Sequence, residues 1–385
     1  MGGTLGKPKL FTKLKLRSLE LKNRIVVSPM CQYMAIDGHV QDWHMGHHAR
    51  FAFGGPALSF VEATGVTPEG RITHGCTGIW DDSHVVGYRK IVELYKSQGI
   101  AVGIQIGHAG RRASAVRPWD GAQPIPEDAI EEPAWERIGP SPIAEQDGYP
   151  PPRGMTHQDI TELVEAFASA TQRALDAGFD TVEIHGAHGY LLHSFFSPIS
   201  NLRNDQYGGD LRRRMTLPLM ITEAVRAIWP DDMPVFFRVS AVDNVPGGIT
   251  IEDTVELSKE LNAHGIDVID CSSGGMLGPA TLSRAKLERG YQVPYAEKIK
   301  LDANVNTMAV GLIIEPEQAE AILDNGQADL IALAREMMSD SNWAYHAALR
   351  LGHESPHDVL PPSYAFHLER RAENLKVDSN INTMT

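Results

Sequence analysis

The chain has 385 residues, which is enough for two ordinary domains or for one large α/β barrel. Its formal net charge of -14 argues against nucleic acid or an anionic membrane surface as the main partner. Cys31, Cys76 and Cys271 lie far apart and form no C-x-x-C motif, which argues against a disulfide framework and against a zinc or iron–sulfur site. No stretch approaches about 18 consecutive apolar residues, and the N-terminal segment has no apolar export core. We therefore expect a cytoplasmic protein without a membrane partner.

Short apolar and β-branched runs alternate along the chain with segments of helical period, which is typical of βα units around a parallel sheet. The sequence predicts eight strands, at Ile25–Met30, Ala57–Thr64, Ala101–Gly107, Thr181–His185, Val235–Ser240, Asp267–Cys271, Thr307–Leu312 and Leu330–Leu333. It predicts helices at Asp42–Phe53, Ser83–Gln98, His157–Ala177, Leu211–Ile228, Ile251–Ala263, Tyr291–Leu301, Glu317–Asn325 and Asn342–Leu351. The number of units, and the absence of a G-x-G-x-x-G motif after any predicted strand, favour an α/β fold of the (β/α)8 TIM-barrel type over a doubly wound sheet.

Two predicted connections are too long to be simple βα loops. Residues 109–155 are rich in proline, glycine and acidic side chains, and residues 189–210 carry aromatic and polar side chains. Both follow predicted strands, so in a barrel they lie at the C-terminal mouth, where catalytic loops are found. We expect a single barrel domain over residues 1–370, with an arm or helix beginning at Pro361, and a polar C-terminal tail over residues 371–385.

Small residues, hydrogen-bond donors and cations cluster where the predicted strands end. They are Ser28, Pro29, Met30, Cys31 and Tyr33 after the first strand, Ala63 in the second, Gln105 in the third, His185, His188 and Tyr190 after the fourth, Arg238 in the fifth, Gly311 in the seventh, and Arg335 after the eighth. Because the C-terminal ends of barrel strands meet at one mouth, this set suits a flat aromatic cofactor with a phosphate tail.

The motif from His185 to Tyr190 is the most informative of these clusters. In a continuing strand, positions three apart point to opposite faces. The glycines and the alanine around His188 indicate that the strand has ended and the chain is turning, so that both imidazoles can face one pocket beside Tyr190. Two neutral donors aimed at one oxygen stabilise a developing enolate, and a tyrosine hydroxyl near the adjacent carbon can deliver a proton.

Two other interpretations of this motif stay open. A lone histidine is more often a buried structural residue than a ligand. The His-x-x-His spacing also permits a metal site, so a metal-dependent barrel hydrolase using His185 and His188 is the alternative function. No nearby carboxylate completes a facial metal site, and Glu183 supplies no clean third ligand. Taken by itself, the motif favours substrate binding by a narrow margin.

The last two strand ends predict a phosphate site. Gly311 closes predicted strand seven and Arg335 closes strand eight, and the turns after these strands are the usual phosphate position in this fold. An ordinary surface salt bridge is the alternative for Arg335. A buried Arg238 needs an anionic partner, which the N1 edge of a reduced flavin would supply. Gln105 offers the donor and the acceptor that the edge of a uracil-like ring requires. Cys31 is expected to fill apolar space, because no histidine is assigned to activate it as a nucleophile.

Six short motifs occur in the order that is characteristic of one enzyme family. They are Ser28–Tyr33, Val61–Thr64, Val66–Ile72, His108–Arg111, His185–Tyr190 and Asp205–Gly209. Together they resemble the Old Yellow Enzyme family, and in particular its thermophilic-like bacterial branch and the xenobiotic reductases. Each motif is modest alone, whereas six in the right order are highly specific. The resemblance runs from about Leu10 to Arg370, nearly the whole chain.

The resemblance implies an ene-reductase with non-covalently bound FMN and no catalytic metal. NAD(P)H would reduce the flavin, whose N5 would then give hydride to an activated alkene, an α,β-unsaturated carbonyl or a nitro compound. His185 and His188 would hold the carbonyl or nitro oxygen, and Tyr190 would give the proton. By the same resemblance the flavin contacts are Ser28, Pro29, Met30, Cys31, Ala63, Gln105, Arg238, Gly311, Ala334 and Arg335, Cys31 tunes the flavin potential, and Tyr33 lines the substrate pocket.

The chain departs from the family pattern at three places. Ala334 stands where relatives have glycine before the phosphate-binding arginine, and Arg112 replaces a lysine. The arm from Pro362 to His367 has no clear match to the arginine or tryptophan that relatives place over a flavin, sometimes that of a neighbouring subunit, and His367 is the nearest candidate. A homodimer and a tetramer both stay open.

Two further rival functions are disfavoured. A 2,4-dienoyl-CoA reductase type of enzyme adds an iron–sulfur cluster and a second domain, which neither the length nor three scattered cysteines allow. A non-catalytic flavin-binding protein would not need the proton donor and both oxygen-binding histidines.

Overall fold

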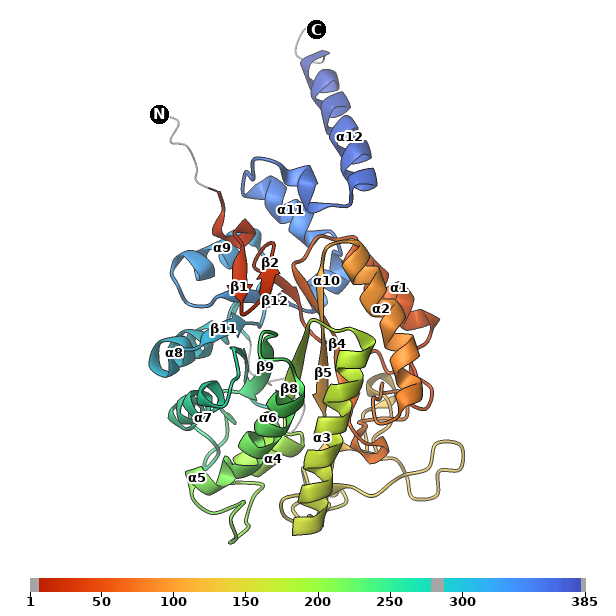
Figure 1. Ribbon diagram of the computed structural model, residues 1–385, viewed down its shortest axis with the longest axis vertical. Helices are drawn as coiled ribbons and strands as arrows, with labels where there is room; N and C mark the ends of the chain where they lie inside the picture. Colours follow the sequence, from red (N-terminus) through yellow and green to blue (C-terminus); the bar gives the residue numbers. More distant parts are fainter. Residues whose placement is uncertain (1–6, 278–286, 382–385) are drawn as a thin grey trace.

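The computed structural model describes residues 7–277 and 287–381 of the chain. Eight parallel strands form a closed barrel, in which each strand is hydrogen-bonded to the preceding and the following one (Figure 1). The strands are β3 (Ile25–Val27), β4 (Leu58–Gly65), β5 (Ala101–Gly107), β8 (Thr181–Gly186), β9 (Val235–Ser240), β10 (Val268–Ser272), β11 (Asn306–Ala309) and β12 (Leu330–Leu333). All eight predicted strands are present within a few residues of their predicted bounds, and the TIM-barrel prediction is confirmed.

Helices surround the barrel as an outer layer (Figure 1). The eight predicted helices correspond to α1 (Asp42–Ala52), α2 (Val85–Ser97), α3 (His157–Ala177), the pair α5 (Leu211–Arg214) and α6 (Thr216–Ile228), α7 (Ile251–Ala263), α8 (Val293–Ala303), α9 (Pro316–Asp324) and α11 (Trp343–Arg350). The sequence did not predict two others, α4 (Leu191–Phe196) and α10 (Arg335–Ser339), whereas α12 (Pro362–Ile381) lies where an arm or helix was expected from Pro361. Local capping fixes some helix starts: Thr156 and Asp159 form a capping box at α3, and Thr250 and Asp253 form one at α7.

The strands are buried on both faces, which explains why they appear in the sequence as continuous apolar runs. At one end of the barrel a hairpin of β1 (Leu14–Leu16) and β2 (Leu19–Leu21) packs Leu16 and Leu21 into a cluster with Phe60, Phe236 and other strand residues. The sequence did not predict this hairpin, because three-residue strands leave too short a pattern. It covers the inward-facing residues from the first halves of the strands, so the opposite, C-terminal mouth is left for a site.

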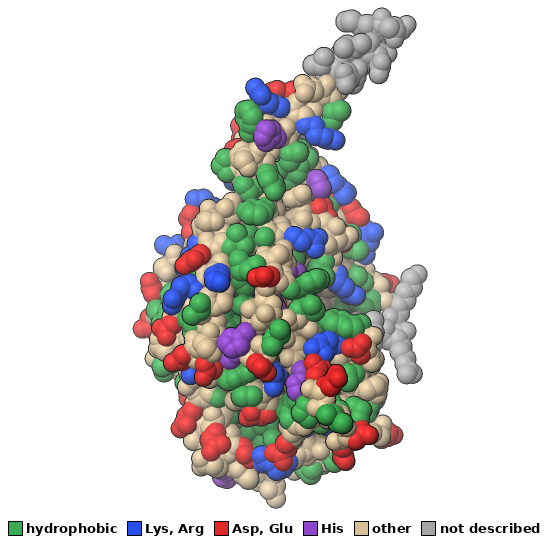
Figure 2. Space-filling model, turned by 90° about the vertical axis from the view of Figure 1, so that its right-hand side faces the viewer, with side chains coloured by type: hydrophobic (Ala, Val, Ile, Leu, Met, Phe, Trp, Pro, Cys, Tyr) green, Lys and Arg blue, Asp and Glu red, His purple; other side chains and the backbone are tan. Residues whose placement is uncertain are grey.

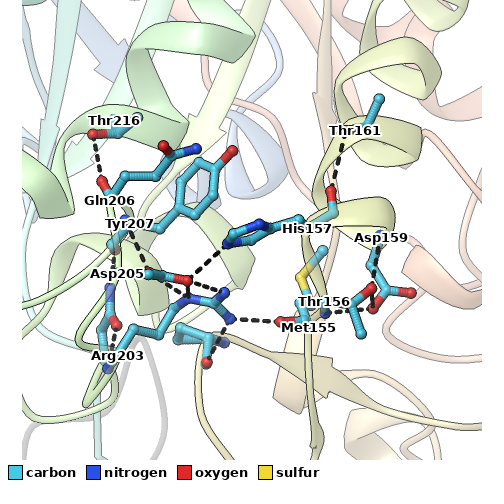
Figure 3. A network of polar contacts seen from close by, with 12 residues as sticks. Met155, Thr156, His157, Asp159, Thr161, Arg203, Asp205, Gln206, Tyr207 and Thr216 are labelled. Atoms are coloured by element: carbon cyan, nitrogen blue, oxygen red, sulfur yellow. Dashed lines mark hydrogen bonds and ion pairs between the residues drawn. The ribbon is translucent and has the colours of Figure 1, made fainter.

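The second long connection, residues 189–210, is anchored by an arginine–carboxylate network (Figure 3). Arg203 Nη2 lies 2.5 Å from Asp205 Oδ2, and Arg203 Nη1 donates to the Met155 carbonyl at 2.5 Å. Asp205 also contacts His157 Nε2 at 3.1 Å and accepts from the Tyr207 backbone N–H at 3.0 Å. The Asp205–Gly209 motif therefore attaches this loop to the start of α3, and its part in the molecule is structural.

The chain beyond the barrel forms a helix that projects from the body of the molecule. Helix α12 extends past α11 and away from the barrel (Figure 1), and Figure 2 shows hydrophobic and charged side chains mixed on its visible surface. Tyr364 approaches Phe53 with ring centroids 6.1 Å apart. The helix runs without interruption through residue 370, so the boundary between barrel and tail at that position stays a prediction, and residues 382–385 lie outside the described part. Among the described residues, no helix is long and apolar enough to cross a bilayer.

Candidate active site

A cavity of about 670 Å³ opens at the C-terminal mouth of the barrel. Residues that directly follow β3 form one wall, and residues from β4, β5, β8 and β9 and from the segments after β8 and β12 form much of the rest. The predicted site residues that line it are Ser28, Pro29, Met30, Cys31, Tyr33, Ala63, Gln105, His185, His188, Tyr190, Arg238, Ala334 and Arg335. Residues that lie more than 300 positions apart in the sequence are thus brought together, as we predicted from their places at the ends of the strands.

The end of β8 turns both histidines toward each other. The strand ends at Gly186, and His188 has a left-handed backbone with φ +61°. The His185 and His188 rings lie 5.1 Å apart, centroid to centroid, at 85° to each other. Gly189 follows with φ +75°, and a Cβ there would lie 2.3 Å from the Gly275 carbonyl oxygen, so only glycine fits. The predicted end of the strand before His188 is confirmed.

Hydrogen bonds fix the protonation of His185. Its Nδ1 accepts from the Ala187 backbone N–H at 3.2 Å, which leaves the ring proton on Nε2. Burial, with Arg238 and His193 nearby, lowers the pKa of His185 well below its ordinary value. The ring is therefore a neutral imidazole that can donate from Nε2.

His188 is held by two serines. Its backbone N–H donates to Ser240 Oγ at 2.9 Å, and its Nε2 lies 2.7 Å from Ser272 Oγ. Burial, followed by the charge of Arg238, lowers the pKa of His188 well below its ordinary value, so this ring is also neutral. No role was predicted for Ser272, which directly follows the predicted strand Asp267–Cys271, because a contact to His188 across 84 positions has no local pattern.

Tyr190 completes the cluster at the end of β8. Its ring centroid lies 4.9 Å from that of His185 and 6.4 Å from that of His188. Burial, with Cys31 nearby, raises the pKa of its hydroxyl above the ordinary value. The hydroxyl therefore keeps its proton at neutral pH and is available as an acid.

A smaller cavity of about 170 Å³ lies beside the first and shares His188, Arg238, Ala334 and Arg335 with it. Gly311 lines it with φ +111°, and a Cβ there would lie 2.7 Å from Gln292 Nε2. Arg335 begins α10 directly after β12, is exposed, and forms no ion pair in the described part of the chain. The surface salt bridge considered for Arg335 is therefore not found among the described residues, and its guanidinium is left to pair with a ligand in this smaller cavity.

Polar side chains below the mouth of the barrel supply partners to Arg238 and Gln105. Arg238 Nε is 3.1 Å from Asp270 Oδ2, and Arg238 Nη1 donates to Ser28 Oγ at 3.4 Å. The protein thus supplies Arg238 with one anionic partner, Asp270, and the flavin contact expected of Arg238 stays a prediction. Gln105 Nε2 donates to Glu183 Oε1 at 2.7 Å, so Gln105 has its amide oxygen left for a ligand.

Cys31 lies at the cavity in a half-buried position. Desolvation, followed by the charge of Glu62, raises the pKa of its thiol well above the ordinary value. A protonated thiol is a poor nucleophile, which agrees with the expectation that Cys31 does not attack a substrate. It does line the cavity, however, and so is more than filler.

Some cavity residues were not predicted, and one predicted rim residue lies elsewhere. Met34, Trp43, Trp119 and Met338 line the cavity and are more than a third exposed. Trp119 packs edge-on against Tyr33, with centroids 5.9 Å apart. Its position in the long loop after β5 was the only available signal. His367 is exposed on α12 and does not line this chain's own cavity.

The family model described as the NADH:flavin oxidoreductase / NADH oxidase family matches residues 9–354. The chain belongs to this family. It is 44% identical over 345 residues to an NADPH dehydrogenase of Geobacillus thermodenitrificans, covering 89% of this chain and 94% of that protein. It is 41% identical over 353 residues to an NADPH dehydrogenase of Bacillus subtilis, covering 91% and 97%.

Solved structures agree with the fold of this flavin oxidoreductase. A morphinone reductase variant in complex with tetrahydroNAD superposes with a TM-score of 0.72 at 25% identity, covering 89% of this chain and 91% of that chain. A 2-naphthoyl-CoA reductase superposes with a TM-score of 0.79 at 23% identity over 91% of this chain, which spans about half (53%) of that longer protein.

Family membership confirms the Old Yellow Enzyme resemblance. The protein is an NAD(P)H-dependent flavin oxidoreductase whose cofactor is FMN. This result decides against the metal-dependent hydrolase that the His-x-x-His spacing left open.

Proposed function

We propose that this flavin oxidoreductase is an ene-reductase, which reduces the C=C bond of an α,β-unsaturated carbonyl compound or, as a further class, acts on a nitro compound. The observation that carries the proposal is the convergence of His185, His188 and Tyr190 in one cavity with Arg238 and Arg335. Two neutral imidazoles and one protonated hydroxyl are the groups needed to polarise an oxygen and to protonate a carbon.

The residues around the two cavities fit FMN. Arg335 has no carboxylate partner among the described residues, and Gly311 leaves space that a Cβ would close. When bound, FMN supplies the hydride for the β carbon of the alkene. Under this proposal, FMN is held without a covalent bond by Ser28, Pro29, Met30, Cys31 and Ala63 around the ring, by Gln105 and Arg238 at its polar edges, and by Gly311, Ala334 and Arg335 at the phosphate.

His185 and His188 would bind the carbonyl or nitro oxygen. His185 donates from Nε2, because its Nδ1 is occupied by the Ala187 N–H. Ser272 Oγ has a single proton and lies within reach of two acceptors, Gln292 Oε1 at 3.3 Å and His188 Nε2 at 2.7 Å. Ser273 also donates to Gln292 Oε1, at 2.9 Å. For His188 to donate as well, Ser272 must give this proton to His188 Nε2, the nearer acceptor, which leaves the ring proton on Nδ1. Ser272 is therefore the residue that sets the tautomer of His188.

Tyr190 would give the proton to the α carbon. Its raised pKa keeps the proton on the hydroxyl across the physiological pH range. Tyr33, packed against Trp119, would line the substrate pocket. The similar morphinone reductase was solved in complex with tetrahydroNAD. For this chain, the proposal is that the nicotinamide ring of NAD(P)H enters the same cavity as the alkene. The proposal also includes a cytoplasmic location and assembly as a homodimer or a tetramer. Under it, the partner is a small-molecule substrate and neither nucleic acid nor a membrane.

Anaerobic half-reactions test this function. NADPH or NADH should bleach the flavin absorbance, and an enone such as cyclohexenone or a nitroalkene should restore it, with one saturated product per flavin. His185→Ala should weaken the binding of p-hydroxybenzaldehyde by about tenfold or more, because one of the two donors to its oxygen is lost. His346→Ala, at an exposed position on α11, is the matched control. A flavoprotein that is reduced normally but is reoxidised by none of these acceptors would show that the proposal is wrong.

A further inference from the structure

A second chamber adjoins the active-site cavity. It measures about 550 Å³ and is built mainly by the long loop after β5. Tyr33 and Tyr190 line both this chamber and the main cavity, so the two spaces meet at the proposed proton donor. A volume of this size is within the range of small-molecule sites, roughly 300–1,000 Å³.

The chamber contains three arginines and one carboxylate. Arg111, Arg112 and Arg137 line it together with Glu145. Glu145 Oε1 lies 2.6 Å from Arg112 Nη2, both side chains being 14% exposed or less. In a protein whose formal net charge is -14, this is a local excess of positive charge beside the active site.

Arg111 and Arg137 donate to neutral groups of the protein. Arg111 is 4% exposed, and its Nη2 donates to the Met276 carbonyl at 2.6 Å and contacts Met276 Sδ at 2.9 Å. Its Nη1 donates to the Ala144 carbonyl at 3.4 Å, and its Nε is buried without a partner. Arg137 donates to the carbonyls of Ala113 at 2.8 Å and Ser114 at 2.6 Å.

Other arginines of the same region have carboxylate partners. Arg117 binds Glu132 through two hydrogen bonds of 2.8 and 2.9 Å, and Arg153 binds Asp159 through bonds of 2.7 and 3.1 Å. A guanidinium taken out of water without an anion is costly, so Arg111 and Arg137 are placed to gain from an anionic ligand. Burial lowers the pKa of Arg111 to about 10, which still leaves it charged at neutral pH.

We propose that this chamber binds the anionic group, a phosphate or a carboxylate, of a ligand whose reactive end lies between His185, His188 and Tyr190. Arg111 and Arg137 supply the charge. Glu145 pairs with Arg112, and its negative charge also acts on Arg111 and Arg137, so it limits the affinity for an anion. The anionic group comes either from the phosphates of the nicotinamide dinucleotide or from a charged tail on the alkene. This inference rests on the proposed function, because it assumes that the nicotinamide dinucleotide and the alkene both react in the main cavity.

The first test uses the oxidised, flavin-loaded protein without a reductant or an alkene, so that it does not depend on catalysis and FMN already occupies the site proposed at Arg335. Inorganic pyrophosphate is titrated into this protein by calorimetry. We expect Arg137→Gln and Arg111→Gln to weaken binding by about tenfold each, since each removes a charged donor. Glu145→Gln should tighten binding several-fold, and an unfolded protein cannot produce that result. Arg117→Gln, in the same loop but paired with Glu132, should leave the affinity unchanged.

The second test separates the two sources of the anion in the flavin-loaded enzyme. If the dinucleotide supplies the anion, Arg137→Gln raises the apparent Kd for NADPH but not that for the uncharged reductant N-benzyl-dihydronicotinamide. If the alkene supplies it, the same variant raises the KM for an enone bearing a distal carboxylate but not that for cyclohexenone. Either result supports the proposal.

The proposal is overturned if the wild-type flavin-loaded protein does not bind pyrophosphate, if Glu145→Gln fails to tighten binding, or if Arg137→Gln changes neither kinetic constant. A flavoprotein that reduces no alkene, but that binds pyrophosphate with the expected variant effects, would instead refute the proposed function alone.

Discussion

The two ends of the active-site mouth, at β8 and at β12, are prepared for ligands in different ways. At the end of β8, His185 and His188 are buried and neutral, and the protein itself supplies hydrogen-bond partners to both rings. At the end of β12, Arg335 is exposed and forms no ion pair in the described part of the chain. The first end is organised before substrate arrives, as polarisation of a bond requires, whereas the second is completed by a charged ligand.

The largest expected effect is that of Tyr190→Phe, which removes the acid at the β8 end without changing the β12 end. Alkene reduction should fall by about 10²–10⁴-fold, the usual contribution of a positioned general acid. Reduction of the flavin by NADPH should be nearly unchanged, because that half-reaction needs no proton from Tyr190. Stopped-flow absorbance of each half-reaction measures both rates. Tyr295→Phe, at a partly buried position on α8 outside the cavity, is the control; if Tyr190→Phe slows alkene reduction no more than this variant does, Tyr190 is not the proton donor.

The converse experiment removes the cation at the β12 end. Arg335→Gln should weaken FMN binding by about 10–100-fold, the range expected when a hydrogen bond to a charged group is lost, with the lower figure favoured because Arg335 is exposed. Once saturated with FMN, the variant should reduce alkenes at nearly the wild-type rate. Fluorescence titration of apoprotein with FMN gives the affinity. Arg289→Gln is the control, since Arg289 is a surface arginine that pairs with Glu315 at 3.4 Å. Equal FMN affinity in all three proteins would place the phosphate elsewhere.

Buried neutral histidines also predict how stability depends on pH. Burial lowers the pKa of His108 to about 3 and that of His47 to about 4. In the unfolded chain each returns to its ordinary value near 6.5, so below that pH the unfolded state binds more protons than the folded state. Their contribution to stability is therefore present above about pH 6.5 and is lost as the pH falls toward 4.

The size of this loss approaches about 1.4 kcal/mol per pH unit for each such histidine. Denaturant unfolding at a series of pH values between the two limits measures the slope. His47→Gln should make the slope shallower, whereas His367→Gln, at an exposed site on α12, should not. Identical slopes in all three proteins would mean that His47 titrates alike in the folded and unfolded states.

The sequence predicted those parts of the molecule that depend on local pattern. The barrel strands were predictable because both of their faces are buried, which gives continuous apolar runs, and the turn at His188 was predictable from the small residues around it. The partners of those residues were not predictable, since Asp270 reaches Arg238, and Ser272 reaches His188, only after the barrel has closed. The second chamber could not be predicted from the sequence either. Its net charge depends on which arginines of the long loop form ion pairs with carboxylates in the folded protein and which do not.

The smallest expected effect concerns His188 and the serine that it contacts at the end of β8. Ser272→Ala removes the hydroxyl that contacts His188 Nε2, so the ring is free to take either tautomer. We expect phenol binding and the KM for enones to worsen by about two- to tenfold, the value of one neutral hydrogen bond, while FMN affinity stays unchanged. Ser273→Ala is a closely matched control, because Ser273 shares the Gln292 contact with Ser272 but is not bonded to His188. Ser272→Thr should restore binding if its hydroxyl takes the same position. If the two alanine variants bind phenols equally well, the β8 end does not depend on this serine, and His188 donates through Nε2 itself.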